Sequence, residues 1–331
     1  MIGHEWAVDL LRRAVTGRRP SHAYLFAGPA QVGKTTLALA FAQALLCEKH
    51  TGTPCGECRT CRRIAQGRDP DVQIIAAEKN TIQIDQVRAL QADAALSPLE
   101  GQYRLFILRE IERATLPAAN ALLKTLEEPP GHVILILTCV RPDQVLPTIQ
   151  SRCQVLPLRP LPLSQVQTAL HEHWQVGAEQ ATLLARLSAG SLGWAVKAFT
   201  DQKLWEQRAQ RLDDLAELAD QNEFARLVYA EKLARTNEIA VQTLGLWASW
   251  WRDVLLVQQG LDTEVVNLDR LEALRRQAAQ YESGQVQTAV TDVAATLRRL
   301  RANVNPRLAL DVLLLRMPRL QQGWRPAQPA A

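Results

Sequence analysis

The residues with the clearest chemical potential form a short loop near the N-terminus. Residues 28–35 read G-P-A-Q-V-G-K-T, which fits the pattern G-x-x-x-x-G-K-[ST] throughout. Its glycines allow a tight turn whose backbone N–H groups face phosphate oxygens, while Lys34 reaches the β- and γ-phosphates and Thr35 can ligate Mg²⁺. The sequence therefore predicts a loop that binds ATP or ADP, and binding does not imply hydrolysis. The predicted binding residues are Gly28, Pro29, Ala30, Gln31, Val32, Gly33, Lys34, Thr35 and Thr36.

Four cysteines follow this loop closely, in the spacing C-x7-C-x2-C-x2-C. Four thiolates can surround one tetrahedral Zn²⁺ and leave no open position, so the pattern predicts a structural zinc site rather than metal catalysis. An iron–sulfur cluster also uses four cysteines and is the alternative. Two further cysteines, Cys139 and Cys153, lie in or beside apolar strands and are predicted to be small core residues. The predicted zinc ligands are Cys47, Cys55, Cys58 and Cys61.

Hydrolysis would need an acid that holds Mg²⁺ at the end of a second strand. In the segment 105–113, L-F-I-L-R-E-I-E-R, Arg109 stands where that aspartate is expected. Its positive charge should repel Mg²⁺ rather than hold it. Glu110 could act on water only as a weak or vestigial catalytic group, and Glu112 is displaced along the chain. The sequence thus predicts a catalytically weak site; the alternative for Arg109 is a surface arginine without a role.

The elements that must position these groups alternate between short strands and helices. Helical patterns at 34–46, 84–96 and 114–126 separate apolar, β-rich runs. This alternation predicts an α/β domain with a parallel sheet covered by helices on both faces. Three prolines within 156–162 place a domain boundary there. The predicted strands are 24–27, 72–76, 104–108, 133–138 and 154–158.

Everything beyond this boundary is predicted to be helical. Short helices are expected at 164–174, 178–187 and 192–199, and longer ones from about residue 202. Two apolar stripes at helical spacing support this, one of which contains Trp247 and Trp251. Packing between helices is the favoured role of the clustered tryptophans, and a stacking platform for single-stranded nucleic acid is the alternative. The stripes are Val286, Val290, Val293, Leu297 and Leu300, and Leu244, Trp247, Trp251 and Val254.

Composition narrows the class of protein. The chain has 331 residues, 47% of them hydrophobic and 22% charged, which is typical of a globular protein of two or three domains. No stretch approaches 18 uncharged apolar residues, and the N-terminus lacks the layout of a signal peptide. We therefore expect a cytoplasmic protein with reduced cysteines. The net charge of +4 is too small to indicate nucleic-acid binding by itself.

Several segments together resemble the clamp loaders of bacterial DNA polymerase III, within the AAA+ superfamily. S-H-A-Y-L-F-A-G-P (21–29) is similar to the family's entry to the phosphate loop, and the cysteine insertion to its zinc module. N-A-L-L-K-T-L-E-E-P-P (120–130) is similar to the helix after the second acidic strand. L-P-T-I-Q-S-R-C-Q (146–154) matches its S-R-C motif, and N-P-R-L-A-L-D-V-L-L-L (305–315) resembles the end of its C-terminal collar.

The resemblance implies a subunit of a five-membered arc that loads a ring-shaped sliding clamp onto primed DNA. Its partners would be the gamma/tau motor subunits and the delta subunit in a heteropentamer, with the clamp and primer–template DNA reached through the complex. Arg152 would act as a finger supplied in trans to a neighbour's γ-phosphate. The implied division is an AAA+ domain at 1–160 with its zinc module at 47–61, a helical lid at 161–201, a helical collar at 202–320 and a flexible tail at 321–331.

Two departures indicate which type of subunit the chain resembles. Arg109 breaks the acidic motif, and Gly193 stands where active members tend to have an arginine that senses phosphate. Both losses fit the delta-prime type, a component of the polymerase complex whose own site is not the motor. The alternatives are an active gamma/tau-type ATPase, which measurable turnover would favour, and a zinc-knuckle nucleic-acid binder, which steeply salt-dependent DNA binding would favour.

Overall fold

The structure is a computed structural model that describes residues 2–78, 80–302 and 304–319. The predicted tail at 321–331 lies outside these residues. The chain forms two compact units, the first of residues 1–178 and 188–196, the second of residues 179–187 and 197–331. Helices of the predicted lid thus occur in both units. The three-part division drawn from the sequence stays a prediction.

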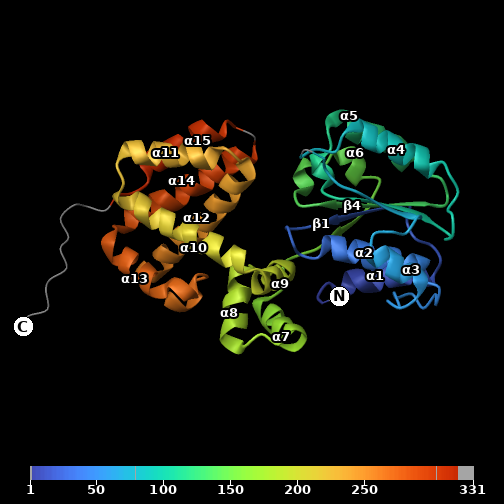
Figure 1. The fold of residues 1–331 in the computed structure, drawn as a ribbon, viewed down its shortest axis with the longest axis horizontal. Helices are drawn as coiled ribbons and strands as arrows, with labels where there is room; N and C mark the ends of the chain where they lie inside the picture. Colours follow the sequence, from blue (N-terminus) through green and yellow to red (C-terminus); the bar gives the residue numbers. More distant parts are fainter. Residues whose placement is uncertain (1, 79, 303, 320–331) are drawn as a thin grey trace, which may run out of the picture. The chain divides into compact units, whose positions relative to one another are not determined.

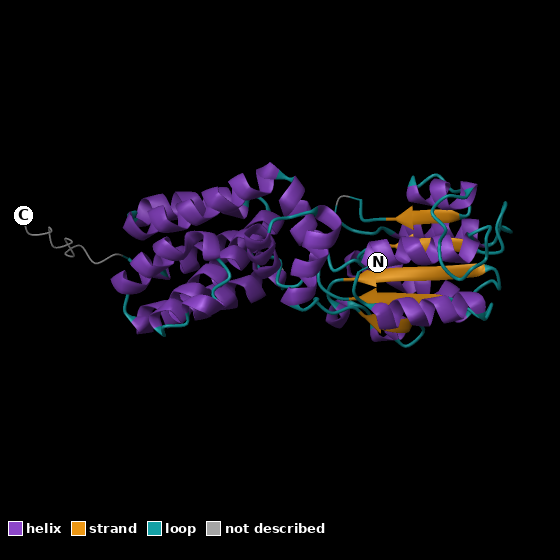
Figure 2. Ribbon diagram, turned by 90° about the horizontal axis from the view of Figure 1, so that it is seen from below, coloured by secondary structure: helices purple, strands orange, loops and turns teal. Residues whose placement is uncertain are grey.

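The first unit is built on a five-stranded, all-parallel sheet (Figure 2). Its spatial order is β2-β3-β4-β1-β5, so β1, which leads into the phosphate loop, lies between β4 and β5. All five predicted strands are present, with ends shifted by no more than one residue. Their bounds are Ala23–Ala27 (β1), Val72–Ile75 (β2), Arg104–Leu108 (β3), Val133–Cys139 (β4) and Gln154–Pro157 (β5).

Helices cover both faces of this sheet, as Figure 1 shows. Successive strand side chains point to opposite faces. Tyr24 and Phe26 therefore pack with α1–α3, whereas Leu25 and Phe106 pack with α4–α6. The predicted α/β architecture is confirmed. The helices of the first unit up to residue 177 are α1 (Glu5–Thr16), α2 (Lys34–Leu46), α3 (Arg59–Ala65), α4 (Ile84–Ala94), α5 (Leu116–Glu127), α6 (Pro147–Gln150) and α7 (Leu163–Trp174), of which α7 does not contribute to either face of the sheet; short 3₁₀ turns lie at Ile111–Arg113 and Pro142–Gln144.

Helices α1 and α3, like the single-turn α6, lie outside the ranges predicted from the sequence. α1 is short and buries only Ala7 and Leu11 completely, so its apolar stripe is narrow. α3 lies within the cysteine insertion, and the side chain of Cys58 caps its N-terminus by accepting from the N–H of Cys61. Both helices depend on contacts with the rest of the unit rather than on a long periodic pattern.

The remaining chain is helical. Its core contains both predicted apolar stripes, and Trp247, Trp250 and Trp251 are buried in it, which confirms the packing role of these tryptophans. Among the described helices none is long and apolar enough to cross a membrane. The bounds are Ala178–Leu187 (α8), Leu192–Thr200 (α9), Gln202–Asp220 (α10), Glu223–Ala234 (α11), Asn237–Gln258 (α12), Leu271–Gln280 (α13), Ser283–Arg301 (α14) and Pro306–Arg316 (α15), with 3₁₀ turns at Asp262–Glu264 and Leu268–Arg270.

Candidate functional site

The phosphate loop occupies the position that the sequence predicted, between the end of β1 and the start of α2. Gly28 has φ +157°, and a Cβ there would lie 2.1 Å from the carbonyl oxygen of Leu158. Only glycine lets the loop pass this close to the chain that follows β5. At the other end of the loop, the imidazole Nε2 of buried His4 lies 3.2 Å from the carbonyl oxygen of Val32. His4 is a support of the loop that no sequence motif indicated.

Lys34 is buried at the first position of α2. Its ammonium Nζ donates to the carbonyl oxygens of Gly28 (2.7 Å) and Pro29 (2.5 Å), so it bends back over the loop. Burial lowers its pKa, and the nearby charges of Glu112 and Glu110 oppose that shift. Within the described residues, backbone carbonyls alone hold this ammonium, and phosphate oxygens, which are stronger acceptors, could replace them.

Three charged residues, Arg109, Glu110 and Glu112, follow β3 at the edge of the site. Arg109 follows β3 directly and is exposed. Glu110 has a left-handed backbone (φ 54°), and its carboxylate is paired with Arg113 at 2.6 Å. One carboxylate oxygen of Glu112 accepts from the N–H of Val140 at 2.8 Å, and the other, Oε2, is buried without a hydrogen-bond partner. The only acid at this edge with an uncommitted buried oxygen is therefore Glu112, at least among the residues described.

The start of α9 lies directly on the phosphate loop. The N–H of Gly193 donates to the carbonyl oxygen of Gln31 at 3.1 Å. A Cβ at residue 193 would lie 2.6 Å from that same oxygen, so the contact exists because this residue has no side chain. Glycine at position 193 is thus what allows the start of α9 to approach the phosphate loop so closely.

Arg152 lies between α6 and β5 and is the middle residue of the S-R-C motif. Its guanidinium Nη1 donates to the carbonyl oxygen of Thr148 (3.0 Å) and to Oγ of Ser151 (3.3 Å). Nη2 is ion-paired with Oε1 of Glu127 at 2.8 Å, although 35% of the Arg152 side chain remains exposed. The sequence singled out Arg152 but gave no sign of Glu127, which is 25 positions earlier and becomes its partner only through the fold.

The four predicted zinc ligands converge. The Sγ atoms of these cysteines all lie within 4.8 Å of one another, close to the ~3.8 Å expected of four sulfurs around Zn²⁺ at 2.3 Å. The N–H of Cys58 donates to Cys55 Sγ, and the N–H of Cys61 to Cys58 Sγ. The hydrogen bonds from the N–H groups of Cys58 and Glu57 lower the pKa of Cys55 to about 6, which favours the thiolate a metal needs. This donor set fits zinc.

The remaining cysteines behave as the sequence indicated. Cys139 is buried at the end of β4, Cys153 is half-buried, and burial raises the pKa of each thiol to about 12. A thiol with such a pKa is protonated and unreactive at neutral pH.

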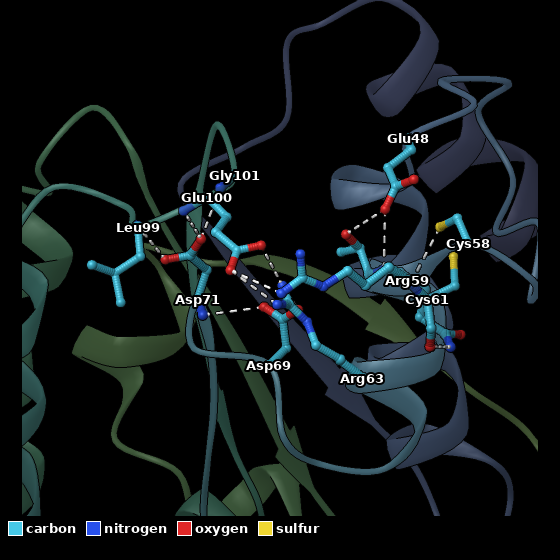
Figure 3. A network of polar contacts seen from close by, with 12 residues as sticks. Glu48, Cys58, Arg59, Cys61, Arg63, Asp69, Asp71, Leu99, Glu100 and Gly101 are labelled. Atoms are coloured by element: carbon cyan, nitrogen blue, oxygen red, sulfur yellow. Dashed lines mark hydrogen bonds and ion pairs between the residues drawn. The ribbon is translucent and has the colours of Figure 1, made fainter.

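A polar network fixes the cysteine cluster to the edge of the sheet (Figure 3). Arg63 of α3 donates to the carboxylates of Asp69 and Glu100, at 3.0 Å and 2.8 Å. Asp71, at the start of β2, accepts the N–H groups of Leu99, Glu100 and Gly101. Arg63 therefore attaches α3 to the segment that leads into β2 and to the loop before β3.

Comparisons with known proteins agree with this arrangement. The sequence profile of the family described as DNA polymerase III, delta subunit, matches residues 3–162, and that of DNA polymerase III, delta subunit, C terminal, matches residues 202–318. DNA polymerase III subunit delta' of Bacillus subtilis is 31% identical over 96% of this chain and 95% of its own length. The Pseudomonas aeruginosa subunit delta' is 34% identical over 89% and 91%. DNA polymerase III subunit tau of Escherichia coli is 37% identical, over 62% of this chain but only 32% of its own length.

Proposed function

The chain belongs to the delta-prime family of DNA polymerase III clamp-loader subunits, and from this membership we propose that it supplies Arg152 as a finger in trans to a neighbouring ATP site. The observation that carries the proposal is the state of the Arg152 side chain. Its guanidinium is held by Glu127 and by the Thr148 carbonyl, yet 35% of the Arg152 side chain is exposed. An arginine that is both fixed and accessible can meet a phosphate on another subunit with little loss of side-chain freedom.

Reconstituting the loader with Arg152→Ala tests this proposal. A trans finger accelerates phosphoryl transfer by about 10³–10⁵-fold in well-studied GTPases. We therefore expect the fast phase of ATP hydrolysis, measured with clamp and primed DNA, to lose the contribution of the one ATP site that Arg152 serves. Assembly of the complex should be unchanged. Arg88→Ala, which removes an exposed arginine of α4, is the control. Unchanged hydrolysis with Arg152→Ala would refute the finger.

For its own nucleotide site, we propose binding with little or no hydrolysis. The intact loop and Lys34 support binding, whereas exposed Arg109 and the engagement of Glu110 by Arg113 argue against an active site. Binding of a fluorescent ADP by the isolated chain, and its loss with Lys34→Ala, would test the first part. Sustained ATP turnover by the isolated chain would instead favour the gamma/tau-type alternative, and with it a stronger role for Mg²⁺.

We propose that the cysteine cluster holds one structural zinc ion. Metal analysis of the purified chain should find about one zinc per chain and no iron, and Cys58→Ser should lower the zinc content. Iron in place of zinc, together with absorbance in the visible range, would show that the cysteines hold an iron–sulfur cluster instead. Because the network around Arg63 joins this module to the sheet, removal of zinc should also loosen the loop at 97–102.

The partners we propose are the motor subunits and delta, in a heteropentamer that reaches the sliding clamp and primer–template DNA, in the cytoplasm at the replisome. An apolar face on the packed helices α11 and α15 supports assembly through the C-terminal helices. Phe224 is 76% exposed and Leu308 63% exposed, and Val228 and Val312 follow each of them by one helical turn. Exposed apolar residues in such a row mark a protein interface. Phe224→Asp should weaken co-elution with the partner subunits.

A further inference from the structure

We propose that Glu127 is a positioning residue for Arg152 and that it sets how fast the neighbouring ATP site hydrolyses. This inference rests on the proposed finger and deepens it. Glu127 is the last residue of α5, and its Oε1 lies 2.8 Å from Nη2 of Arg152. It is the only acidic side chain paired with this arginine among the residues that the structure describes.

The hydrogen bonds of Arg152 leave part of its guanidinium uncommitted. An arginine has five N–H donors in a rigid, planar fork. Nη1 donates to the Thr148 carbonyl and to the Ser151 hydroxyl, and Nη2 forms the ion pair with the Glu127 carboxylate. Nε makes no hydrogen bond or ion pair within the described residues, so this donor remains for a phosphate oxygen. The intramolecular bonds therefore fix the direction of the fork without filling it.

The two partners are held at a fixed separation by the core of the first unit. Leu126, next to Glu127, and Ile149, at the end of α6, are both buried in the same apolar cluster, and α5 packs against α6. Neither backbone can move away without disturbing that core. The fold therefore keeps the two side chains within reach of each other, although 35% of the Arg152 side chain and 51% of the Glu127 side chain are exposed.

Helix stability does not account for a carboxylate at this position. The C-terminal end of a helix carries partial negative charge, so an acid there is unfavourable and a cation is favourable. Glu127 ends α5, and Glu128 is its C-cap residue. Glu128 is exposed and has no side-chain partner in the described part of the chain, whereas Glu127 is paired with Arg152. Glu128 is thus a matched control, one residue away and of the same charge.

A double-mutant cycle in the reconstituted loader separates positioning from other effects. Glu127→Ala should lower the rate of stimulated ATP hydrolysis about three- to tenfold, through kcat rather than KM, as expected when a reacting group loses its orientation. Glu127→Gln should lower the rate of hydrolysis less, because the amide oxygen of glutamine can still accept a hydrogen bond from Arg152. Glu128→Ala should change nothing. In the Arg152→Ala background, Glu127→Ala should have no further effect.

The outcomes distinguish this inference from the finger itself. If Arg152→Ala leaves hydrolysis unchanged, the proposed function fails and this inference fails with it. If Arg152→Ala slows ATP hydrolysis but Glu127→Ala does not, the proposed finger is supported and the positioning role of Glu127 is refuted. If the two losses of rate multiply in the double variant, Glu127 acts independently of Arg152 and the inference is refuted. If Glu127→Ala raises the rate, Glu127 competes with the phosphate for Arg152, which would also refute it. Melting temperature and assembly of each variant show whether a loss comes from misfolding.

Discussion

Replacing Asp71 by asparagine should loosen the attachment of the metal module to the sheet. Asp71 is 2% exposed, and its two carboxylate oxygens accept three backbone N–H groups. Oδ1 accepts from Leu99 at 2.7 Å, and Oδ2 accepts from Glu100 and Gly101, each at 2.8 Å. The carboxylate therefore closes the loop that leads into β3.

The expected cost follows from these contacts. An asparagine can place its amide oxygen at the Oδ2 position and keep two bonds, but its NH₂ group then faces the N–H of Leu99. One charge-assisted bond is lost, a buried donor is left unpaired, and two bonds are weakened by loss of charge. Charge-assisted bonds contribute about 1.5–3 kcal/mol each, so Asp71→Asn should lower the free energy of unfolding of this unit by about 2–3 kcal/mol. Asp71→Ala should cost more.

Denaturant unfolding followed by circular dichroism measures this loss, and amide hydrogen exchange at residues 99–101 locates it. Asp93→Asn is the control, because Asp93 lies 3.9 Å from Arg104 and is 40% exposed, and such pairs contribute about 1 kcal/mol or less. A change below about 1 kcal/mol for Asp71→Asn, or unaltered exchange at these three amides, would refute the reasoning.

The contacts of the Asp71 carboxylate also predict how its contribution to stability depends on pH. Burial alone would raise the pKa of Asp71, but the N–H groups of Leu99, Glu100 and Gly101 outweigh it and lower the pKa. A lowered folded-state pKa contributes stability above the unfolded value, about 3.9, and that stability is lost as pH falls toward the folded value. The difference between wild type and Asp71→Asn should thus be constant from neutral pH to about pH 5 and shrink below about pH 4. A difference that grows on acidification would contradict this.

Two further predictions concern other contacts. Gly193→Ala should separate α9 from the phosphate loop, because the new Cβ would lie 2.6 Å from the Gln31 carbonyl oxygen, and should lower stability in thermal unfolding by about 1–3 kcal/mol. Gly177→Ala is the control and should be neutral, because no atom lies within 4 Å of its Cβ. Equal melting temperatures for the two variants would count against the contact. Arg226 is fully buried and donates to five backbone carbonyls near the ends of α10 and α15, and no acid within the described residues accepts a hydrogen bond from it. Arg226→Met should therefore lower the free energy of unfolding by about 3–5 kcal/mol, measured by urea unfolding with tryptophan fluorescence. Arg235→Met, at an exposed arginine, is the control and should not lower it. Similar losses from both variants would show that the burial of Arg226 is unimportant.

The sequence by itself determined the features whose chemistry is local. The phosphate loop and the four cysteines are each written in fewer than 16 consecutive residues, so their spacing alone limits what they can bind. The strands and most helices also follow from the sequence, because side-chain direction repeats every two residues in a strand and every 3.6 in a helix. The prediction that Arg109 stands where a Mg²⁺-binding aspartate is expected likewise needed no coordinates.

Only the tertiary structure decided which of these residues act together. Glu127 reaches Arg152, Asp71 closes a loop 28 to 30 positions away, and Glu112 accepts from Val140, although no periodic pattern joins any of these pairs. The order β2-β3-β4-β1-β5 and the close approach of Gly193 to the phosphate loop are likewise invisible in the sequence. The reason is physical: an ion pair or hydrogen bond forms over about 3 Å in space, and separation along the chain says nothing about that distance until packing of the core has fixed the elements that carry both partners.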